Sequence, residues 1–427
     1  MTLAPPQNTA PGDEDGGLST PLLTAVLVGL FALVFPLGYA WDLGFSGLAA
    51  LAGLLAIPAL RRARPPVRVI LPLAALVAWA VFSLTWSRAG VDIRTLHRYA
   101  DIEKLTGMKL VLQLGVYGAL VAAAQRVSRR GAGLALAALA LALTALGAAV
   151  MLDALQGAAA YAWIAGRISH GVPPDIARRN IAQGDYVIAL FFWCAAVRLS
   201  HMRWLILSVV MAACVAGSSL YLHAVDTTLV ALALGLAAFM LVRATRTFGV
   251  VVLAVVTTIY WMTAPLIVLG GVRTGLVRML HAHVQTSWSE RLDIWSFAAA
   301  KIVEKPWAGW GLDASRTFGS AISLHTHDAA MQVWLELGAV GAVLAAAFWV
   351  GVWSLIETLA RRDRTVAAAA AGTAVAYLTI GGLSFGVWQE WWLGLGAMAA
   401  VACICLARYR FDPQAASDDE LVPLGIG

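Results

Sequence analysis

The amino-acid sequence predicts an all-α, polytopic helical membrane protein of about twelve transmembrane helices, with one large outer loop, 272–326, between spans nine and ten. Three observations support this fold class. Apolar residues make up 60% of the chain and charged residues 13%, whereas a soluble domain is about half apolar and a quarter charged. The apolar residues form runs of about 18–25, the length that crosses a bilayer. Short basic loops separate alternate runs, as cytoplasmic loops do.

Twelve apolar runs are the predicted spans, and they divide the chain into three parts. Residues 1–19 and 409–427 are expected to be disordered cytoplasmic tails around a membrane domain, 20–408. The fifth span is expected to continue as an interfacial segment to Ile164, and the tenth is long enough to tilt or protrude. The predicted spans are 20–40, 43–60, 68–86, 107–125, 131–152, 182–198, 204–222, 225–243, 248–270, 328–358, 365–386 and 390–408.

Six short basic loops set the predicted orientation. Because Lys and Arg collect on the cytoplasmic side, both termini are expected to be cytoplasmic, and the long loops 86–106, 153–181 and 272–326 face outward. The basic loops explain the net charge of +6 without a nucleic-acid partner. The four cysteines lie in apolar runs, where small buried residues are the simplest interpretation. The basic loops are 61–68, 125–131, 198–204, 243–246, 361–364 and 407–410.

The outer loop contains two predicted helices. An amphipathic stretch, 272–288, predicts one helix lying on the bilayer surface. The residues Ser287-Trp-Ser-Glu290 have the form of a capping box, so a second helix is expected to begin at Ser287 and run until Pro306. Arg291 falls in its first turn, where it favours anion binding. The alternative is a cation–π pair between Arg291 and Trp295, one turn further on the same face.

His327 stands at the start of the tenth span and is followed by Gly338 and Gly341. Eleven residues are three helical turns plus about 20°, so a continuous helix places Gly338 below His327 on one stripe. Such small residues admit a neighbouring helix or a lipid chain. Helix packing and an interfacial histidine are the simpler alternatives. Glu336, about 13 Å below His327 by helical rise, is expected to face the other side and to pair with a neighbour.

Two further basic clusters are predicted on the same face. Arg178 and Arg179 precede the sixth span, where adjacent guanidinium groups suit bidentate binding of a phosphate. Pairing with Asp175 or Asp185 is the alternative. The first long loop supplies the other cluster, which consists of Arg88, Arg94, Arg98, Lys104 and Lys109.

The motifs Arg291-Leu-x-x-Trp295 and His327-Asp328-x9-Gly338-x-x-Gly341, with the outer arginines and the long late loop, resemble the O-antigen ligase family. The signature of that family is His, then Asn, Ser or Gln, nine residues and Gly-x-x-Gly. The resemblance implies that His327 and Arg291 are catalytic. Asp328 departs from the signature, and its carboxylate is expected to raise the basicity of His327 or to orient its ring. The implied substrate-binding residues are Arg178, Arg179, Arg88, His325, Asp328, Trp295, Gly338 and Gly341.

The resemblance also implies a reaction. The enzyme would lie in the bacterial inner membrane and, at its periplasmic face, transfer a glycan from undecaprenyl pyrophosphate to a hydroxyl of the lipid A–core oligosaccharide. His327 would be the general base, and Arg291 with Arg178 or Arg179 would stabilise the pyrophosphate leaving group. Inversion is expected, with no cofactor and no metal. The acidic pair Asp101-Ile-Glu103 is the metal alternative, but its carboxylates diverge by about 200° on a helix and lie among basic residues.

Two alternative functions remain open. An O-antigen polymerase or a protein O-oligosaccharyltransferase has the same donor and topology and differs in its acceptor. The spacing of His327 and the glycines, and the lack of a further C-terminal domain, favour the ligase. A transporter of lipid-linked glycans would need ionisable residues near mid-membrane, for which Glu336 is a candidate.

Overall fold

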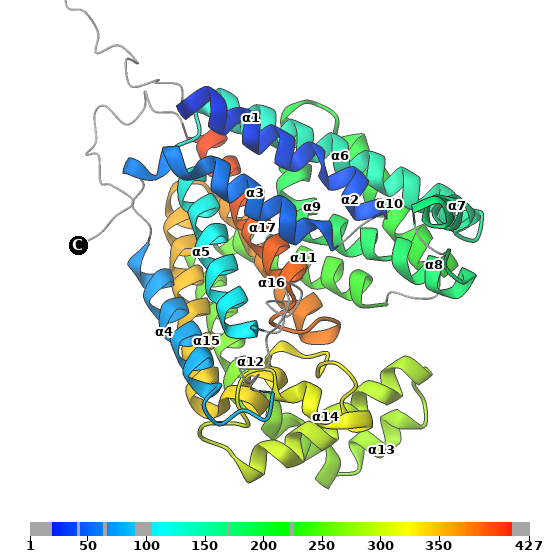
Figure 1. Cartoon of the computed structure of the whole chain (residues 1–427). Coiled ribbons are helices and arrows are strands. Elements are labelled where there is room, and N and C mark those ends of the chain that lie inside the picture. Colours follow the sequence, from blue (N-terminus) through cyan, green and yellow to red (C-terminus); the bar gives the residue numbers. More distant parts are fainter. Residues whose placement is uncertain are drawn as a thin grey trace, which may run out of the picture.

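The computed structural model describes residues 19–40, 43–62, 66–89, 105–168, 171–222 and 226–411, and every regular element within them is a helix. The all-α prediction is therefore confirmed. In the same residues, ten segments are long and apolar enough to cross a membrane. Two shorter apolar helical segments, Gly44–Leu60 and Val67–Ser83, accompany them. Figure 1 shows these helices packed into one bundle.

Each of the twelve predicted spans has a helical counterpart whose ends lie within a few residues of the prediction. The segment that follows the fifth span is a separate helix, α7 (Ala159–Ile168), after a turn with positive φ at Gly157 and Ala158, and its interfacial location stays a prediction. The counterparts are α1 (Ser19–Ala32) with α2 (Val34–Ala40), α3 (Gly44–Ala56), α4 (Val67–Ser83), α5 (Thr106–Ala124), α6 (Arg129–Leu155), α9 (Gln183–His201), α10 (Leu205–Leu222), α11 (Asp226–Thr245), α12 (Thr247–Arg273), α15 (Ala329–Arg362), α16 (Arg364–Leu383) and α17 (Glu390–Arg410).

Two long helices organise the packing. α6 contacts α1, α9, α10 and α17, whereas α15 contacts α12, α4 and α16. One hydrophobic core cluster surrounds α6 and includes Leu136 and Phe191, and a second surrounds α15 and includes Trp353 and Trp261. In Figure 1 the second group of helices continues into α13 (Leu276–His281) and α14 (Thr286–Glu304), which lie together at one end of the bundle.

The outer loop departs from the prediction at its beginning. α12 continues to Arg273, and Gly275, with φ +78°, separates it from the short α13. The segment 272–288 is therefore not one surface helix. A glycine in the left-handed conformation is a common way to end a helix, and here it overrides the amphipathic periodicity.

The start of α14 also differs from the prediction, whereas its end agrees. The N-cap residue is Gln285, in an extended conformation, and no side chain caps the helix. The predicted capping box that begins at Ser287 is therefore wrong. The helix ends at Glu304, just ahead of Pro306, as the missing N–H of proline requires.

α15 is interrupted at Gly338, which has φ +65° and ψ −162°. His327 precedes the helix with φ +56°, and Asp328 is the N-cap. The prediction that Gly338 lies below His327 on one continuous helical stripe is therefore wrong. A Cβ atom on Gly338 would lie 2.3 Å from the carbonyl oxygen of Trp307, so the glycine allows a backbone segment of the outer loop to reach the helix axis.

Backbone groups released by this break are hydrogen-bonded to the outer loop and to α4. A buried carbonyl without a partner costs about 1–3 kcal/mol, so these bonds make the interrupted helix stable. They also fix the outer loop to the membrane domain. The bonds run from Trp310 N to Leu335 O (2.9 Å), Gly311 N to Glu336 O (2.7 Å), Trp79 Nε1 to Leu337 O (3.0 Å) and Ala339 N to Pro306 O (2.8 Å).

Candidate active site

His325 and His327 lie side by side immediately before α15, with ring centroids 4.2 Å apart. Nδ1 of His327 lies 2.8 Å from the carbonyl oxygen of Ser384. Because a carbonyl oxygen accepts and does not donate, Nδ1 must carry the proton. Nε2 of the neutral ring is then an acceptor, and no described residue donates a hydrogen bond to it. His327 is thus oriented to take a proton through Nε2.

His325 has a different set of contacts. Its Nδ1 accepts the backbone N–H of His327 at 3.1 Å, and its Nε2 faces Nε2 of Gln389 at 3.3 Å. The side chain is buried, with 6% of its surface exposed. Through its Nδ1, His325 therefore holds the backbone of His327 in place.

Both histidines are kept neutral. Burial lowers the pKa of His327 below its ordinary 6.5, and the positive charge of Arg291 lowers it further, although the hydrogen bond to Ser384 acts in the opposite direction. Burial also lowers the pKa of His325 to about 3, and nearby positive charges add to the effect. Neutral imidazole is the form that accepts a proton, so His327 is in the form required of a base at neutral pH.

Asp328 does not orient His327. Its Oδ1 accepts the N–H of Met331 at 2.9 Å and the hydroxyl of Tyr260 at 2.9 Å. Burial raises the pKa of Asp328 to about 6 against these hydrogen bonds. The expectation that Asp328 tunes or orients His327 is therefore wrong. Asp328 caps α15, and the Ser384 carbonyl orients the ring.

α14 brings Arg291 to the histidine pair. α14 packs against α15, and Trp295 fixes the contact by donating its Nε1–H to the carbonyl oxygen of Thr326 at 2.8 Å. The guanidinium carbon of Arg291 lies 4.7 Å from the centroid of the Trp288 ring, so Trp295 was the wrong cation–π partner. The charge of Arg291 lowers the pKa of both histidines, which places it within electrostatic range of them.

The connection between α16 and α17 supplies contacts that the sequence analysis missed. Besides its carbonyl bond to His327, Ser384 places its Oγ 3.1 Å from the hydroxyl of Tyr186. A backbone carbonyl leaves no residue-type signature, so no motif could have pointed to Ser384. The available signal was Gln389, a polar residue between two apolar spans, which lies beside His325.

Glu336 is fully buried and paired with neighbours, as expected. Oε2 accepts the Nε1–H of Trp388 at 2.7 Å and the backbone N–H of Asp313 at 3.0 Å. Oε1 accepts from Nε2 of Gln332 at 3.1 Å. The carboxylate joins α15 to the outer loop and to the α16–α17 connection, which is a structural role.

The predicted basic cluster of the first long loop is only partly described. The guanidinium carbon of Arg88 lies 4.9 Å from the centroid of the Trp310 ring, and Nζ of Lys305 lies 4.2 Å from it. Lys109 forms an ion pair with Glu390. Arg88 therefore lies beside the segment that bridges the break in α15. The rest of that cluster, together with the acidic pair, lies outside the described residues: Arg94, Arg98, Lys104, Asp101 and Glu103.

Arg178 and Arg179 are exposed on α8 (Pro174–Ile181), which packs against α7 and α9. In the described part of the chain, neither arginine pairs with Asp175 or Asp185, so the acid-pairing alternative is not observed. Asp185 is buried and accepts from Oγ of Ser218 at 2.8 Å. The described residues also show no hydrogen bond from either arginine to the histidine pair, and Figure 1 shows α8 apart from α13 and α14.

Comparisons with known proteins match the part of the chain that holds this site. The family model described as O-antigen ligase matches residues 208–346. This range runs from α10 into α15 and contains Arg291, His327, Gly338 and Gly341, whereas Arg178, Arg179 and Ser384 lie outside it.

Three relatives, from Rickettsia conorii, Rickettsia felis and Rickettsia typhi, bear the name "Putative polysaccharide ligase". They are 30% identical over 139 residues, 29% over 139 and 28% over 136, respectively. Each match covers 29% of this chain and 33% of the relative. The chain thus spans about a third of the length of the curated relatives it matches.

Proposed function

We propose that the chain, whose residues 208–346 match the O-antigen ligase family model, transfers a glycan from undecaprenyl pyrophosphate to a hydroxyl of the lipid A–core oligosaccharide. The observation that supports this most directly is the orientation of His327. Its Nδ1–H is bound to the Ser384 carbonyl at 2.8 Å, and the acceptor nitrogen Nε2 is left to deprotonate a sugar hydroxyl.

The proposed step is a single displacement. Nε2 of His327 takes the proton of the acceptor hydroxyl as its oxygen attacks the anomeric carbon. The bond from that carbon to the pyrophosphate oxygen breaks with its electron pair, and the configuration inverts. A positioned base of this kind contributes about 10²–10⁴-fold to a rate. The chemistry needs no cofactor.

Arginines stabilise the charge that develops on the pyrophosphate. Arg291 is the first of them, because its charge already acts on the histidine pair. Arg178 and Arg179 are exposed and without an acidic partner among the described residues, so either can bind the second phosphate when the donor is present. Two guanidinium groups neutralise the leaving group as a metal ion would, and we propose that no metal takes part.

The remaining substrate contacts belong to the same face. Arg88 follows α4 and lies over the Trp310 ring, and Trp295, in the middle of α14, donates to the Thr326 carbonyl. Gly338 and Gly341 lie in α15. His325 and Asp328 set the backbone around His327. We place this face in the periplasm, with the membrane domain 20–408 in the bacterial inner membrane and both tails in the cytoplasm.

A transfer assay with purified protein tests the proposal. The full chain is incorporated into lipid nanodiscs with excess EDTA and supplied with undecaprenyl-pyrophosphate-linked glycan and lipid A–core. We expect glycan-bearing lipid A–core as the product. Loss of product in EDTA that Mg²⁺ restores would contradict the metal-independent mechanism.

The same assay distinguishes the alternative acceptors. Without lipid A–core we expect no extension of the glycan on its lipid carrier. Extension on the carrier in that reaction would identify a polymerase, and transfer to an added protein acceptor would identify a protein O-oligosaccharyltransferase.

A further inference from the structure

A second, strongly basic site lies at the far end of α15 from the histidine pair. The part of α15 that follows the break at Gly338 runs to Arg362 and is by itself about 36 Å long, so the two sites lie towards opposite ends of α15. The cavity has a volume of about 330 Å³, within the range of about 300–1,000 Å³ typical of ligand pockets. Its lining consists of Arg243, Arg246, Ala360, Arg361, Arg362, Asp363, Arg364, Thr365 and Arg410.

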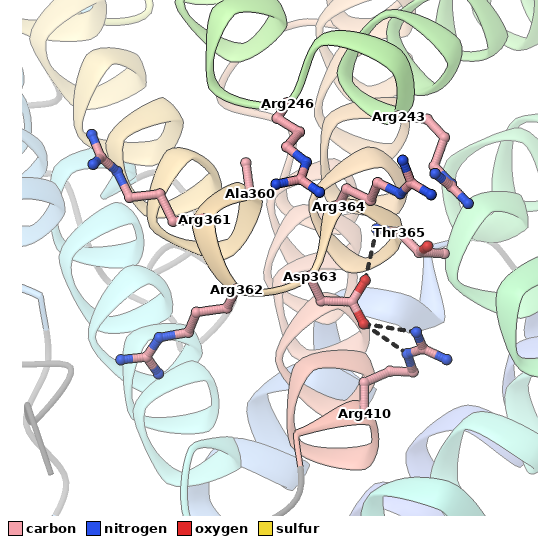
Figure 2. A pocket seen from close by; sticks show the side chains of 9 residues that line it. All are labelled: Arg243, Arg246, Ala360, Arg361, Arg362, Asp363, Arg364, Thr365 and Arg410. Atoms are coloured by element: carbon pink, nitrogen blue, oxygen red, sulfur yellow. Dashed lines mark hydrogen bonds and ion pairs between the residues drawn. The ribbon is translucent and has the colours of Figure 1, made fainter. Parts of the chain in front are cut away.

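Three separate parts of the chain bring these arginines together. Arg243 lies in the last turn of α11, and Arg246 lies in the turn to α12 with φ +53°. Arg364 begins α16. Figure 2 shows Arg243 and Arg246 extending from the α11–α12 turn towards the start of α16, where Arg364 lies. Arginines in cytoplasmic loops orient a membrane protein wherever they lie in those loops. Orientation alone therefore does not explain why these arginines line one cavity.

The acidic groups near the cavity are already engaged. Oδ2 of Asp363 binds Arg410 at 2.8 Å, and its Oδ1 accepts the N–H of Thr365 at 2.7 Å. Glu357 pairs with Arg361 at 2.7 Å. In Figure 2 the dashed lines join Asp363 to Arg410 and to the start of α16, and none reaches the arginines of the α11–α12 turn.

Four guanidinium groups of the lining are consequently left without an ion pair in the described part of the chain: Arg243, Arg246, Arg362 and Arg364. That of Arg362 lies 6.0 Å from the centroid of the Phe411 ring, and Figure 2 shows it directed away from the other three. Like charges held around one cavity repel each other, and a bound anion removes this repulsion. The planar guanidinium group matches the oxygens of a phosphate and binds it through two parallel N–H donors.

The cavity borders the surface that lipid would cover. Phe248 is two residues from Arg246, at the start of α12, and 66% of its surface is exposed. Met240, one turn before Arg243, is 58% exposed. Large apolar side chains at the end of a membrane-spanning helix face acyl chains, so the neighbouring arginines lie at the depth of the lipid headgroups.

We propose that this cavity binds the phosphate of an anionic phospholipid headgroup, held by Arg243, Arg246 and Arg364. The site is separate from the proposed glycan transfer and does not depend on it. Basic pockets between transmembrane helices are suited to such headgroups. A soluble phosphate would use the same guanidinium groups, but the exposed Phe248, two residues after Arg246 at the start of α12, favours a ligand with acyl chains.

A matched pair of variants tests the proposal. Arg246 and Arg203 both have positive φ, +53° and +60°, in turns that follow predicted cytoplasmic helix ends, but Arg203 does not line the cavity. Glycine adopts these conformations without strain, so Arg246→Gly and Arg203→Gly should both fold. Arg364→Gln removes a second guanidinium group of the cavity without changing a positive-φ position.

Binding is measured by native mass spectrometry of the detergent-purified full chain, titrated with phosphatidylglycerol, phosphatidylcholine or inorganic phosphate. We expect wild type and Arg203→Gly to retain phosphatidylglycerol in preference to phosphatidylcholine. Arg246→Gly and Arg364→Gln should each weaken that retention at least fivefold. Equal retention by all four proteins would overturn the proposal. Displacement of phosphatidylglycerol by millimolar inorganic phosphate would instead identify a soluble-anion site and overturn the lipid assignment.

Discussion

At the scale of single residues, two histidines separated by one position acquire different chemistry from their hydrogen bonds. The Nδ1 of His325 accepts the backbone N–H of His327, whereas the Nδ1–H of His327 donates a hydrogen bond to the Ser384 carbonyl, which leaves Nε2 as an acceptor. The motif spacing predicts His327 as the base, and the carbonyl that orients its ring, that of Ser384, lies far along the chain.

The lowered pKa of His327 predicts the pH dependence of transfer. The base must be neutral, and its pKa lies below 6.5, so the rate should stay level from pH 8 to about 6.5 and fall at lower pH as the ring is protonated. Removing the charge of Arg291, which lowers this pKa, should move the fall to higher pH. Rates of wild type, Arg291→Gln and the control Arg278→Gln, measured from pH 4.5 to 8, check this. An unchanged profile in Arg291→Gln would contradict it.

The geometry of the Arg291 side chain gives a separate prediction. Arg291→Lys keeps the charge but loses the paired N–H donors, so transfer should fall at least tenfold while the pH profile stays that of wild type. Arg278→Lys, on the exposed α13, should leave the rate unchanged. Turnover near wild type in Arg291→Lys would show that Arg291 does not bind the pyrophosphate.

At the scale of elements, the break in α15 is the feature that joins the outer loop to the membrane domain. Gly338 was predicted as a surface for packing, and it is instead the point where the helix opens to accept the loop backbone. Its left-handed φ could not be predicted from the Gly-x-x-Gly spacing, because that spacing is equally typical of helix packing. Gly275 in the sequence indicated a possible helix end, but the amphipathic periodicity of 272–288 favoured one continuous helix across it.

Two glycine substitutions measure the importance of this break. Gly338 and Gly319 have φ of +65° and +61°, so alanine strains the backbone at both positions, and at Gly338 the ψ of −162° makes the conformation one that only glycine adopts readily. A Cβ on Gly338 also meets Trp307 at 2.3 Å, whereas one on Gly319 meets nothing within 4 Å. Gly338→Ala should therefore lower the midpoint of thermal unfolding in detergent far more than Gly319→Ala. Equal midpoints would show that the loop is not anchored at this point.

At the scale of the whole molecule, the fold was the most predictable property. Runs of about twenty apolar residues separated by alternate basic loops predict a bundle of transmembrane helices, because a helix satisfies all its backbone hydrogen bonds inside the bilayer. Each of the twelve predicted spans corresponds to a helix in the structure. The sequence motifs predict Arg291 and His327 as site residues, and in the structure the charge of Arg291 acts on His327; their catalytic roles stay predictions. Further contacts come from the α16–α17 connection, where the Ser384 carbonyl leaves no residue-type signature and Gln389 is the one signal.

Orientation in the membrane follows from the same basic loops and is directly testable. A reporter fused after Arg362 should report the cytoplasm, and one fused after Ser315 should report the periplasm, because Lys and Arg are retained inside. Alkaline phosphatase and green fluorescent protein fusions at both points give opposite signals for each compartment. Interchanged signals would place the histidine pair in the cytoplasm and exclude the proposed donor.

The most direct test of the account compares the two histidines in the nanodisc transfer assay. Asparagine tolerates the positive φ of His327, +56°, so His327→Asn and His325→Asn form a matched pair. Wild-type elution in size-exclusion chromatography confirms that each is folded. We predict that His327→Asn lowers the transfer rate by about 10²–10⁴-fold and that His325→Asn lowers it far less. A near-normal rate in His327→Asn, or a greater loss in His325→Asn, would contradict the assignment of His327 as the base.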